Sequence, residues 1–242
     1  MRRTFAKTHL LIKNPKSKIE NLNMYPKGNL QIPASHGTLE AILKEPSGAV
    51  KGAAVVCHPH PLGQGTMHNK VVYRAAAGLV EAGLTTIRFN FRGVGASTGA
   101  HDDGMGERQD VKDVLDYLTE NYPNQPVTLA GFSFGSRVGT EVSLDEKRIL
   151  RLISIGTPVD KYDFSFLKRN EKPILFVHGD RDEFGAVENL RKLVETLECE
   201  KELIIFENCG HFFNEHLSEL KNAIRDWTLK EISHEQTRKA TK

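Results

Sequence analysis

The stretch VTLAGFSFGSRVG, Val127 to Gly139, decides which fold this sequence predicts. It begins with an apolar run typical of a buried strand, and a helix is expected to follow from residue 134. Between them residues 131–135 read GFSFG, a G-x-S-x-G pattern that places one hydroxyl on a sharp strand-to-helix turn. Glycines on both sides avoid collisions with neighbouring backbone. Ser133 is therefore a candidate nucleophile at the carboxyl edge of a sheet, where open α/β sheets bind ligands.

Strand-like and helix-like segments alternate on both sides of this turn. Strands are expected at 52–58, 84–91, 125–132, 148–156, 172–179 and 201–207, and helices at 69–83, 107–122, 134–144, 186–198 and 216–232. Residues 29–46 read as an opening hairpin with His36 and Gly37 at its turn. The alternation predicts an α/β fold with a mostly parallel central sheet flanked by helices on both faces.

The 242 residues fit one domain. We expect this domain to span residues 29–230. Residues 1–28 contain seven basic side chains and one acidic side chain, and we expect them to form a basic N-terminal extension. Residues 231–242 are expected to form a frayed tail.

Composition excludes several classes of protein. The net charge is +2 and no helix carries a basic stripe, so we expect no nucleic-acid partner. No apolar run is long enough for a membrane span, so no membrane partner is expected either. The three cysteines are an odd number without C-x-x-C spacing, which favours reduced thiols and a cytoplasmic protein. The oligomeric state stays open.

A serine nucleophile needs a base and a group that orients the base. His211 follows the last predicted strand, and Asp180 and Asp182 both follow the strand before it. The chain order Ser, Asp, His, with each residue just past a strand, is that of α/β-hydrolases. His216 is a weaker candidate base because it falls within the last predicted helix.

The same chemistry needs two backbone N–H donors for a developing oxyanion. Phe134, the residue after the nucleophile, supplies one amide. The second is expected after the strand at 52–58, where the sequence reads HPHPLG. Because Pro59 and Pro61 have no N–H, the remaining candidates are the amides of His60 and Leu62.

These motifs, with CHPHPLGQGTMHNKVV (57–72) and FNFRGVGASTG (89–99), resemble the α/β-hydrolase superfamily from about Asn29 to Leu229. The branch they look like is that of small, lidless, dienelactone-hydrolase-like serine hydrolases. The resemblance implies Asp182 as the acid, with Asp180 as the alternative, and His60 as the second oxyanion donor. Dienelactone hydrolases themselves use a cysteine nucleophile, so their substrate is not implied here.

The sequence therefore predicts a serine carboxylesterase that hydrolyses small or short-chain esters through an acyl-enzyme, with Ser133, His211 and Asp182 as the triad. Residues 157–171 are too few for a lid domain, which favours a shallow pocket and a small-molecule ester substrate. No cofactor and no metal is expected. A lactone, thioester or aminoacyl substrate is the alternative, and a non-catalytic binding protein on the same fold is a further one.

Several other side chains have competing interpretations. His58, His60 and His68 lie close in sequence, but the prolines between them disrupt helical ligand spacing, so no metal site is expected. Arg92 belongs to a glycine-rich turn and is either structural or a ligand for an anionic substrate group. Cys209 is a candidate oxidation sensor only by its closeness to His211.

The candidate substrate-binding residues are Leu62, Phe132, Phe212 and Phe213, although the phenylalanines fit a core equally well.

Overall fold

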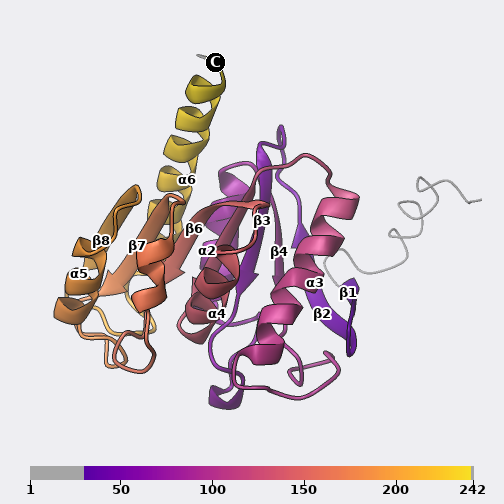
Figure 1. Ribbon diagram of the computed structural model, residues 1–242, viewed down its shortest axis with the longest axis horizontal. Helices are drawn as coiled ribbons and strands as arrows, with labels where there is room; N and C mark the ends of the chain where they lie inside the picture. Colours follow the sequence, from indigo (N-terminus) through magenta and orange to yellow (C-terminus); the bar gives the residue numbers. More distant parts are fainter. Residues whose placement is uncertain (1–29, 241–242) are drawn as a thin grey trace, which may run out of the picture.

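An eight-stranded sheet forms the centre of the computed structural model, which describes residues 30–240 (Figure 1). Its strands are β1 Leu30–Ala34, β2 Gly37–Lys44, β3 Gly52–Cys57, β4 Leu84–Phe89, β5 Val127–Phe132, β6 Ile149–Ile155, β7 Ile174–Gly179 and β8 Lys201–Phe206. They lie in the order β1-β2-β4-β3-β5-β6-β7-β8. All neighbouring pairs from β4 to β8 are parallel, and β2 is antiparallel to both its neighbours. The predicted mostly parallel α/β sheet is confirmed.

Helices cover both faces of this sheet. They are α2 Lys70–Glu81, α3 Met105–Asn121, α4 Phe134–Ser143, α5 Val187–Glu195 and α6 Leu217–Ala240, with short 3-10 turns η2 Pro61–Gly63 and η3 Ser165–Arg169. Apolar residues of α3, α4 and α5 belong to one buried cluster, and those of α2 and α6 to the other. The connection between β6 and β7 contains only η3, so no helical lid is inserted there.

The sequence of strand β3 is apolar throughout because both faces of the strand are covered. Val55 and Cys57 pack with the α3–α4 cluster, whereas Ala54 and Val56 pack with the α2–α6 cluster. Because side chains alternate between two covered faces, every residue of β3 is buried. A continuous apolar run is therefore the expected signature of a central strand here.

The predicted helix at 69–83 begins and ends where its sequence indicates. The Asn69 side chain accepts a hydrogen bond from the Val71 N–H (2.9 Å) and so caps the first turn of α2. Gly83 follows the helix with a φ of 97°, a left-handed conformation that glycine adopts without strain.

The C-terminal helix extends further than the sequence indicated. Residues 231–240, expected to be part of a frayed tail, are helical, and Figure 1 shows the last turns of α6 extending past the sheet. No glycine or proline interrupts them, Ile232 is buried, and Arg238 pairs with Glu200. The expected basic extension, residues 1–28, lies outside the described residues.

Within residues 30–240, no helix combines the length and the hydropathy that crossing a membrane requires.

Candidate active site

Ser133 occupies a strained turn between β5 and α4. Its backbone angles are φ 55° and ψ −120°, which L-residues rarely adopt. The flanking glycines are required by close backbone contacts. A Cβ at Gly131 would lie 2.3 Å from the Gly135 oxygen, and one at Gly135 would lie 2.5 Å from the His58 oxygen. The turn thus directs the Ser133 side chain beyond the carboxyl end of the parallel strands.

The residues predicted as base and acid meet at this turn. His211, which follows β8, lies with Nε2 2.9 Å from Ser133 Oγ. Its Nδ1 lies 2.7 Å from Oδ2 of Asp182, which follows β7. Because an ionised carboxylate only accepts hydrogen bonds, His211 Nδ1 donates to Asp182 and Nε2 accepts from the serine hydroxyl. The three side chains form one chain of hydrogen bonds in which Asp182 and His211 are buried.

The structure distinguishes Asp182 from Asp180. Asp182 uses its second oxygen, Oδ1, to accept the Phe184 N–H (2.8 Å). Asp180 instead accepts the backbone N–H of Cys209 (3.0 Å) and makes no contact with His211 that would orient the imidazole. Hydrogen bonds from the Cys209 and Asn208 amides lower the pKa of Asp180, which keeps it ionised as a loop anchor. His216 stacks on Phe206 rather than approaching Ser133.

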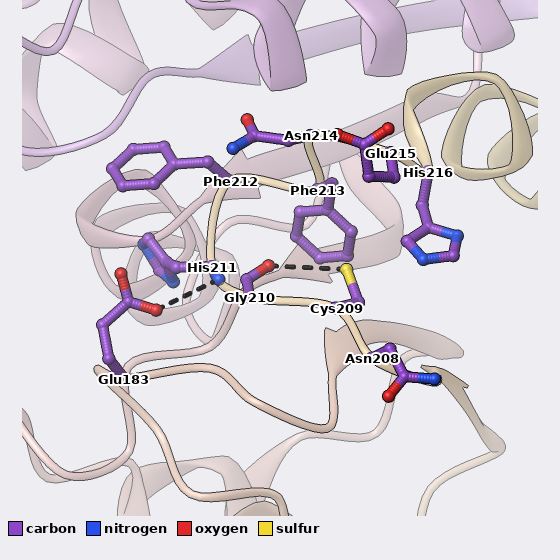
Figure 2. Close-up of a pocket in the computed structure, with 10 residues that line it drawn as sticks. All are labelled: Glu183, Asn208, Cys209, Gly210, His211, Phe212, Phe213, Asn214, Glu215 and His216. Atoms are coloured by element: carbon purple, nitrogen blue, oxygen red, sulfur yellow. Dashed lines mark hydrogen bonds between the residues drawn. The ribbon is translucent and has the colours of Figure 1, made fainter.

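The loop that carries His211 borders a cavity of about 280 Å³ and is held by one side-chain and one backbone hydrogen bond (Figure 2). Glu183 Oε2 accepts the backbone N–H of His211 (3.3 Å), and Arg181 N–H donates to the Cys209 carbonyl (2.9 Å). Figure 2 also shows the Cys209 thiol directed at the Gly210 carbonyl. Burial, followed by the charges of Asp180 and Asp182, raises the pKa of Cys209 to about 11, so the thiol stays protonated and poorly reactive.

Two backbone amides that border the cavity are candidates for an oxyanion hole. Phe134 is the first residue of α4, where a helix leaves its N–H without an intrahelical acceptor. The Ser133 N–H is already bound to the Ile155 carbonyl (2.9 Å). The Leu62 N–H is bound to Nδ1 of the His60 imidazole (3.2 Å), which leaves the His60 amide as the better second candidate.

His58 holds the peptide that carries the His60 amide. It is fully buried, its Nδ1 donates to the Pro59 carbonyl (2.6 Å), and its Nε2 accepts the Phe91 N–H (2.9 Å). In a trans peptide the Pro59 carbonyl and the His60 N–H point in opposite directions. The bond to Pro59 therefore directs the His60 N–H away from the buried imidazole. Burial lowers the pKa of His58 to about 4, so this imidazole is neutral at neutral pH.

A cavity of about 380 Å³ opens beside Ser133 and His211. The remaining lining residues are Pro59, His60, Gly63, Gln64, Gly65, Asn69, Phe134, Pro158, Lys161, Tyr162, Phe184 and Phe212. Of the four side chains predicted to bind substrate, Phe212 is the one that lines it.

The other three predicted pocket residues lie elsewhere. Phe132 and Phe213 are fully buried, and Phe132 packs with its ring centroid 4.8 Å from that of His211. Leu62 is 77% exposed on η2 and faces solvent. Sequence reasoning missed Tyr162 and Phe184. Their positions shortly after β6 and β7 are the signal that could have identified them, since the carboxyl ends of parallel strands share one edge.

Arg92 does not reach this cavity. Its guanidinium pairs with Asp110, a buried residue of α3 (Nη2 to Oδ1, 2.6 Å), and its backbone N–H donates to the same carboxylate. Despite partial burial, hydrogen bonding to Asp110 raises the pKa of Arg92. The glycine-rich turn at residues 92–99 is therefore anchored to α3, and its arginine is structural.

Two of the three histidines that lie close in sequence, His58 and His68, differ in their surroundings. Both ring nitrogens of His58 are bound within the protein, and His68 is exposed.

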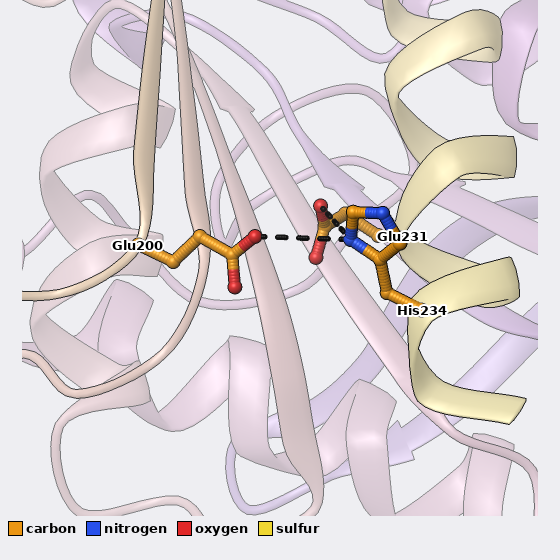
Figure 3. Close-up of side chains that lie close together, drawn as sticks. All are labelled: Glu200, Glu231 and His234. Carbon is orange, nitrogen blue, oxygen red and sulfur yellow. Dashed lines mark ion pairs between the residues drawn. The ribbon is translucent and has the colours of Figure 1, made fainter. Parts of the chain in front are cut away.

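A different group, Glu200, Glu231 and His234, brings its ligand atoms within 4.8 Å of one another in the described part of the chain (Figure 3). It lies where α6 passes the start of β8. Glu200 is already paired with Arg238 (2.9 Å) and with His234 (3.8 Å), so the cluster ties α6 to the sheet through ion pairs.

Comparisons with known proteins agree with the fold. A family model described as an alpha/beta hydrolase domain matches residues 52–237. An uncharacterised protein from Rickettsia prowazekii (strain Madrid E) is 39% identical over 185 residues, which cover 73% of this chain and 78% of that protein.

Two solved structures are similar over most of this chain. One, described as an alpha-beta serine hydrolase homologue from Coxiella burnetii, is 37% identical with a TM-score of 0.80 and covers 84% of this chain and 97% of its own. The other, from Xanthomonas campestris, is described as a serine hydrolase without a lid. It is 33% identical with a TM-score of 0.78 and covers 86% of this chain and 96% of its own.

Proposed function

The chain belongs to the alpha/beta hydrolase family, and from this premise we propose that it is a serine carboxylesterase that cleaves small esters through an acyl-enzyme. The observation that carries the proposal is the unbroken chain of hydrogen bonds from Ser133 through His211 to Asp182, beside an open cavity.

In the proposed mechanism, Ser133 Oγ attacks the ester carbonyl while His211 Nε2 takes its proton. Asp182 keeps the imidazole in the tautomer that can accept this proton and stabilises the imidazolium that forms. The amides of Phe134 and His60 bind the oxyanion, and each such donor typically contributes about 2.7–4 kcal/mol to transition-state stabilisation. His211 then protonates the leaving alcohol, and a water molecule that it activates releases the acid.

The cavity supports small substrates. It has about 380 Å³, and within residues 30–240 no helical lid is inserted between β6 and β7, so little apolar surface is available there to bury a long acyl chain. We therefore expect short acyl chains to be hydrolysed faster than long ones.

The test is hydrolysis of a p-nitrophenyl ester series by the wild type and by Ser133→Ala. We expect the highest kcat/KM with the shortest acyl chains and loss of hydrolysis in the variant. Rates that rise towards long chains would contradict the small-substrate part of the proposal. A Ser133→Ala variant as active as the wild type would contradict the mechanism. Parallel assays with a lactone, a thioester and an aminoacyl amide compare the bond classes directly.

A further inference from the structure

We propose that Lys161 forms an anion subsite in the cavity beside Ser133, so that the preferred esters carry a second, negatively charged group such as the free carboxylate of a dicarboxylic acid half-ester. This inference rests on the proposed esterase function and adds the chemical class of the substrate.

The cavity lining is positive and rich in hydrogen-bond donors. Outside the proposed triad, its polar side chains are those of His60, Gln64, Asn69, Lys161 and Tyr162. Each can donate a hydrogen bond. Burial, followed by the nearby His101, lowers the pKa of His60, so its imidazole is neutral at neutral pH. Lys161 is then the one full charge among these lining side chains.

Carboxylates near the site face away from the cavity. Asp182 lies behind the His211 imidazole with its side chain fully buried. Glu183 binds the backbone N–H of His211 and lines the neighbouring cavity drawn in Figure 2. The chain as a whole has 31 acidic and 33 basic residues, so composition does not force this arrangement.

Lys161 is held close to the proposed catalytic groups. Its Nζ lies 5.8 Å from the centroid of the Phe184 ring, and that ring lies 4.6 Å from the imidazole of His211. The backbone is fixed at Lys161 and at the residue before it. Lys161 N–H donates to the Pro158 carbonyl (3.0 Å), and Asp160 N–H donates to the Phe184 carbonyl (3.3 Å). The ammonium group and the imidazole thus both lie close to the Phe184 ring.

The acids beside Lys161 in sequence are engaged elsewhere. Asp160 accepts hydrogen bonds from the Ala186 N–H and the Asn189 amide at the start of α5. Asp163 accepts from the backbone and hydroxyl of Ser165. Within the described residues, no carboxylate lies within ion-pair distance of Lys161. Lys161 acts on Asp160 only at longer range, where its charge contributes to the lowered pKa of that carboxyl. A cation at a cavity wall without a carboxylate in ion-pair contact is available to a substrate anion.

The experiment compares anionic and neutral esters of similar shape. On the acyl side the pair is the mono-p-nitrophenyl ester of glutaric acid and p-nitrophenyl valerate. On the alcohol side it is p-carboxyphenyl acetate and p-carbamoylphenyl acetate. Both pairs are assayed with the wild type, Lys161→Met and Lys161→Arg. Lys168→Met, at an exposed lysine on η3 outside the cavity lining, is the matched control.

We expect the wild type to prefer the anionic member of at least one pair. Lys161 is exposed at the cavity wall, so Lys161→Met should lower that preference in kcat/KM by roughly two- to fivefold, the size expected for an ion pair at an exposed lysine. Lys161→Arg should keep the preference, Lys168→Met should not change it, and added salt should reduce it.

Equal anionic-to-neutral ratios in the wild type and Lys161→Met, in both pairs, would overturn the inference. The esterase proposal is tested separately with a neutral fluorophosphonate probe. If the probe labels Ser133 in the wild type and in Lys161→Met while their anionic-to-neutral ratios of kcat/KM are equal, only the anion subsite is wrong. No labelling of the wild type would remove the esterase proposal itself.

Discussion

Two loops at the carboxyl edge of the sheet each contain a buried histidine with both ring nitrogens bound, yet the two histidines differ in what they bind. His58, after β3, binds main-chain atoms of Pro59 and Phe91. His211, after β8, binds the side chains of Ser133 and Asp182. Burial and full hydrogen bonding are therefore common to both. An imidazole between a carboxylate and a hydroxyl can move a proton, whereas one between two main-chain groups fixes the backbone.

The largest expected effect is at His211. Replacing His211 with Ala should lower kcat by about 10⁴-fold or more, because Ser133 then has no base. His216→Ala is the control from the same region and should stay within a few-fold of the wild type, since His216 stacks on Phe206. Steady-state kinetics on a short p-nitrophenyl ester measures both. Similar losses of kcat in the two variants would contradict the assignment of His211, rather than His216, as the base.

Asp182 should come next. Asp182→Asn keeps the size of the side chain but lets His211 adopt the wrong tautomer, so kcat should fall by about 10⁴-fold. Asp180→Asn is the matched control, because Asp180 binds the Cys209 amide instead. We expect it to keep kcat within about tenfold and to lower mainly the free energy of unfolding. A greater kcat loss in Asp180→Asn than in Asp182→Asn would reverse the assignment.

Replacement of His58 should affect stability first. His58→Phe leaves the Pro59 carbonyl and the Phe91 N–H without their buried partner, which should lower the free energy of unfolding by about 2–4 kcal/mol. We also expect a lower kcat with little change in KM, because the His60 amide is less well fixed. Urea denaturation and steady-state kinetics measure the two effects. An unchanged free energy of unfolding would contradict the role given to His58.

The lowered pKa of His58 also predicts that the free energy of unfolding depends on pH. Its pKa falls from an ordinary value of about 6.5 to about 4 on folding. The unfolded chain therefore binds more protons between these values, and the neutral imidazole stabilises the fold above about pH 6.5. This contribution is lost as the pH falls towards 4. Its loss between about pH 7 and pH 5 should lower the free energy of unfolding by about 2 kcal/mol. The His58→Phe variant should lack this part of the change.

The smallest effects are expected at the cavity wall. Phe212 lines the cavity, so Phe212→Ala should raise KM for a short aryl ester by about two- to fivefold through lost apolar contact. Leu62 is exposed on η2, so Leu62→Ala should leave KM and stability nearly unchanged. Michaelis curves for both variants provide the measurement. A larger change in KM from Leu62→Ala would mean that η2 contacts the substrate.

Much of the fold follows from local sequence. Central strands such as β3 and β5 are covered on both faces, so each reads as an unbroken apolar run between turn residues. The geometry of the Ser133 turn needs glycine on both sides, and this requirement is visible in five residues. His211 and Asp182 were predictable because parallel strands bring their carboxyl ends to one edge.

The cavity wall was harder to predict because it depends on side-chain direction. Phe132 adjoins the nucleophile in sequence, but its ring packs beneath His211 in the core. Tyr162 and Phe184 come from loops whose conformation is set by contacts such as Asp160 N–H to the Phe184 carbonyl. The end of α6 was missed for a similar reason. Its polar last turns are supported by contacts with Glu200, which is distant in sequence.

The most direct test of the proposed nucleophile is to react the purified protein with a fluorophosphonate and identify the modified residue by peptide mass spectrometry. We expect a single adduct on Ser133 in the wild type, no adduct in Ser133→Ala and strongly slowed formation of the adduct in His211→Ala. An adduct on another residue, or equal labelling of the wild type and Ser133→Ala, would contradict the proposed nucleophile.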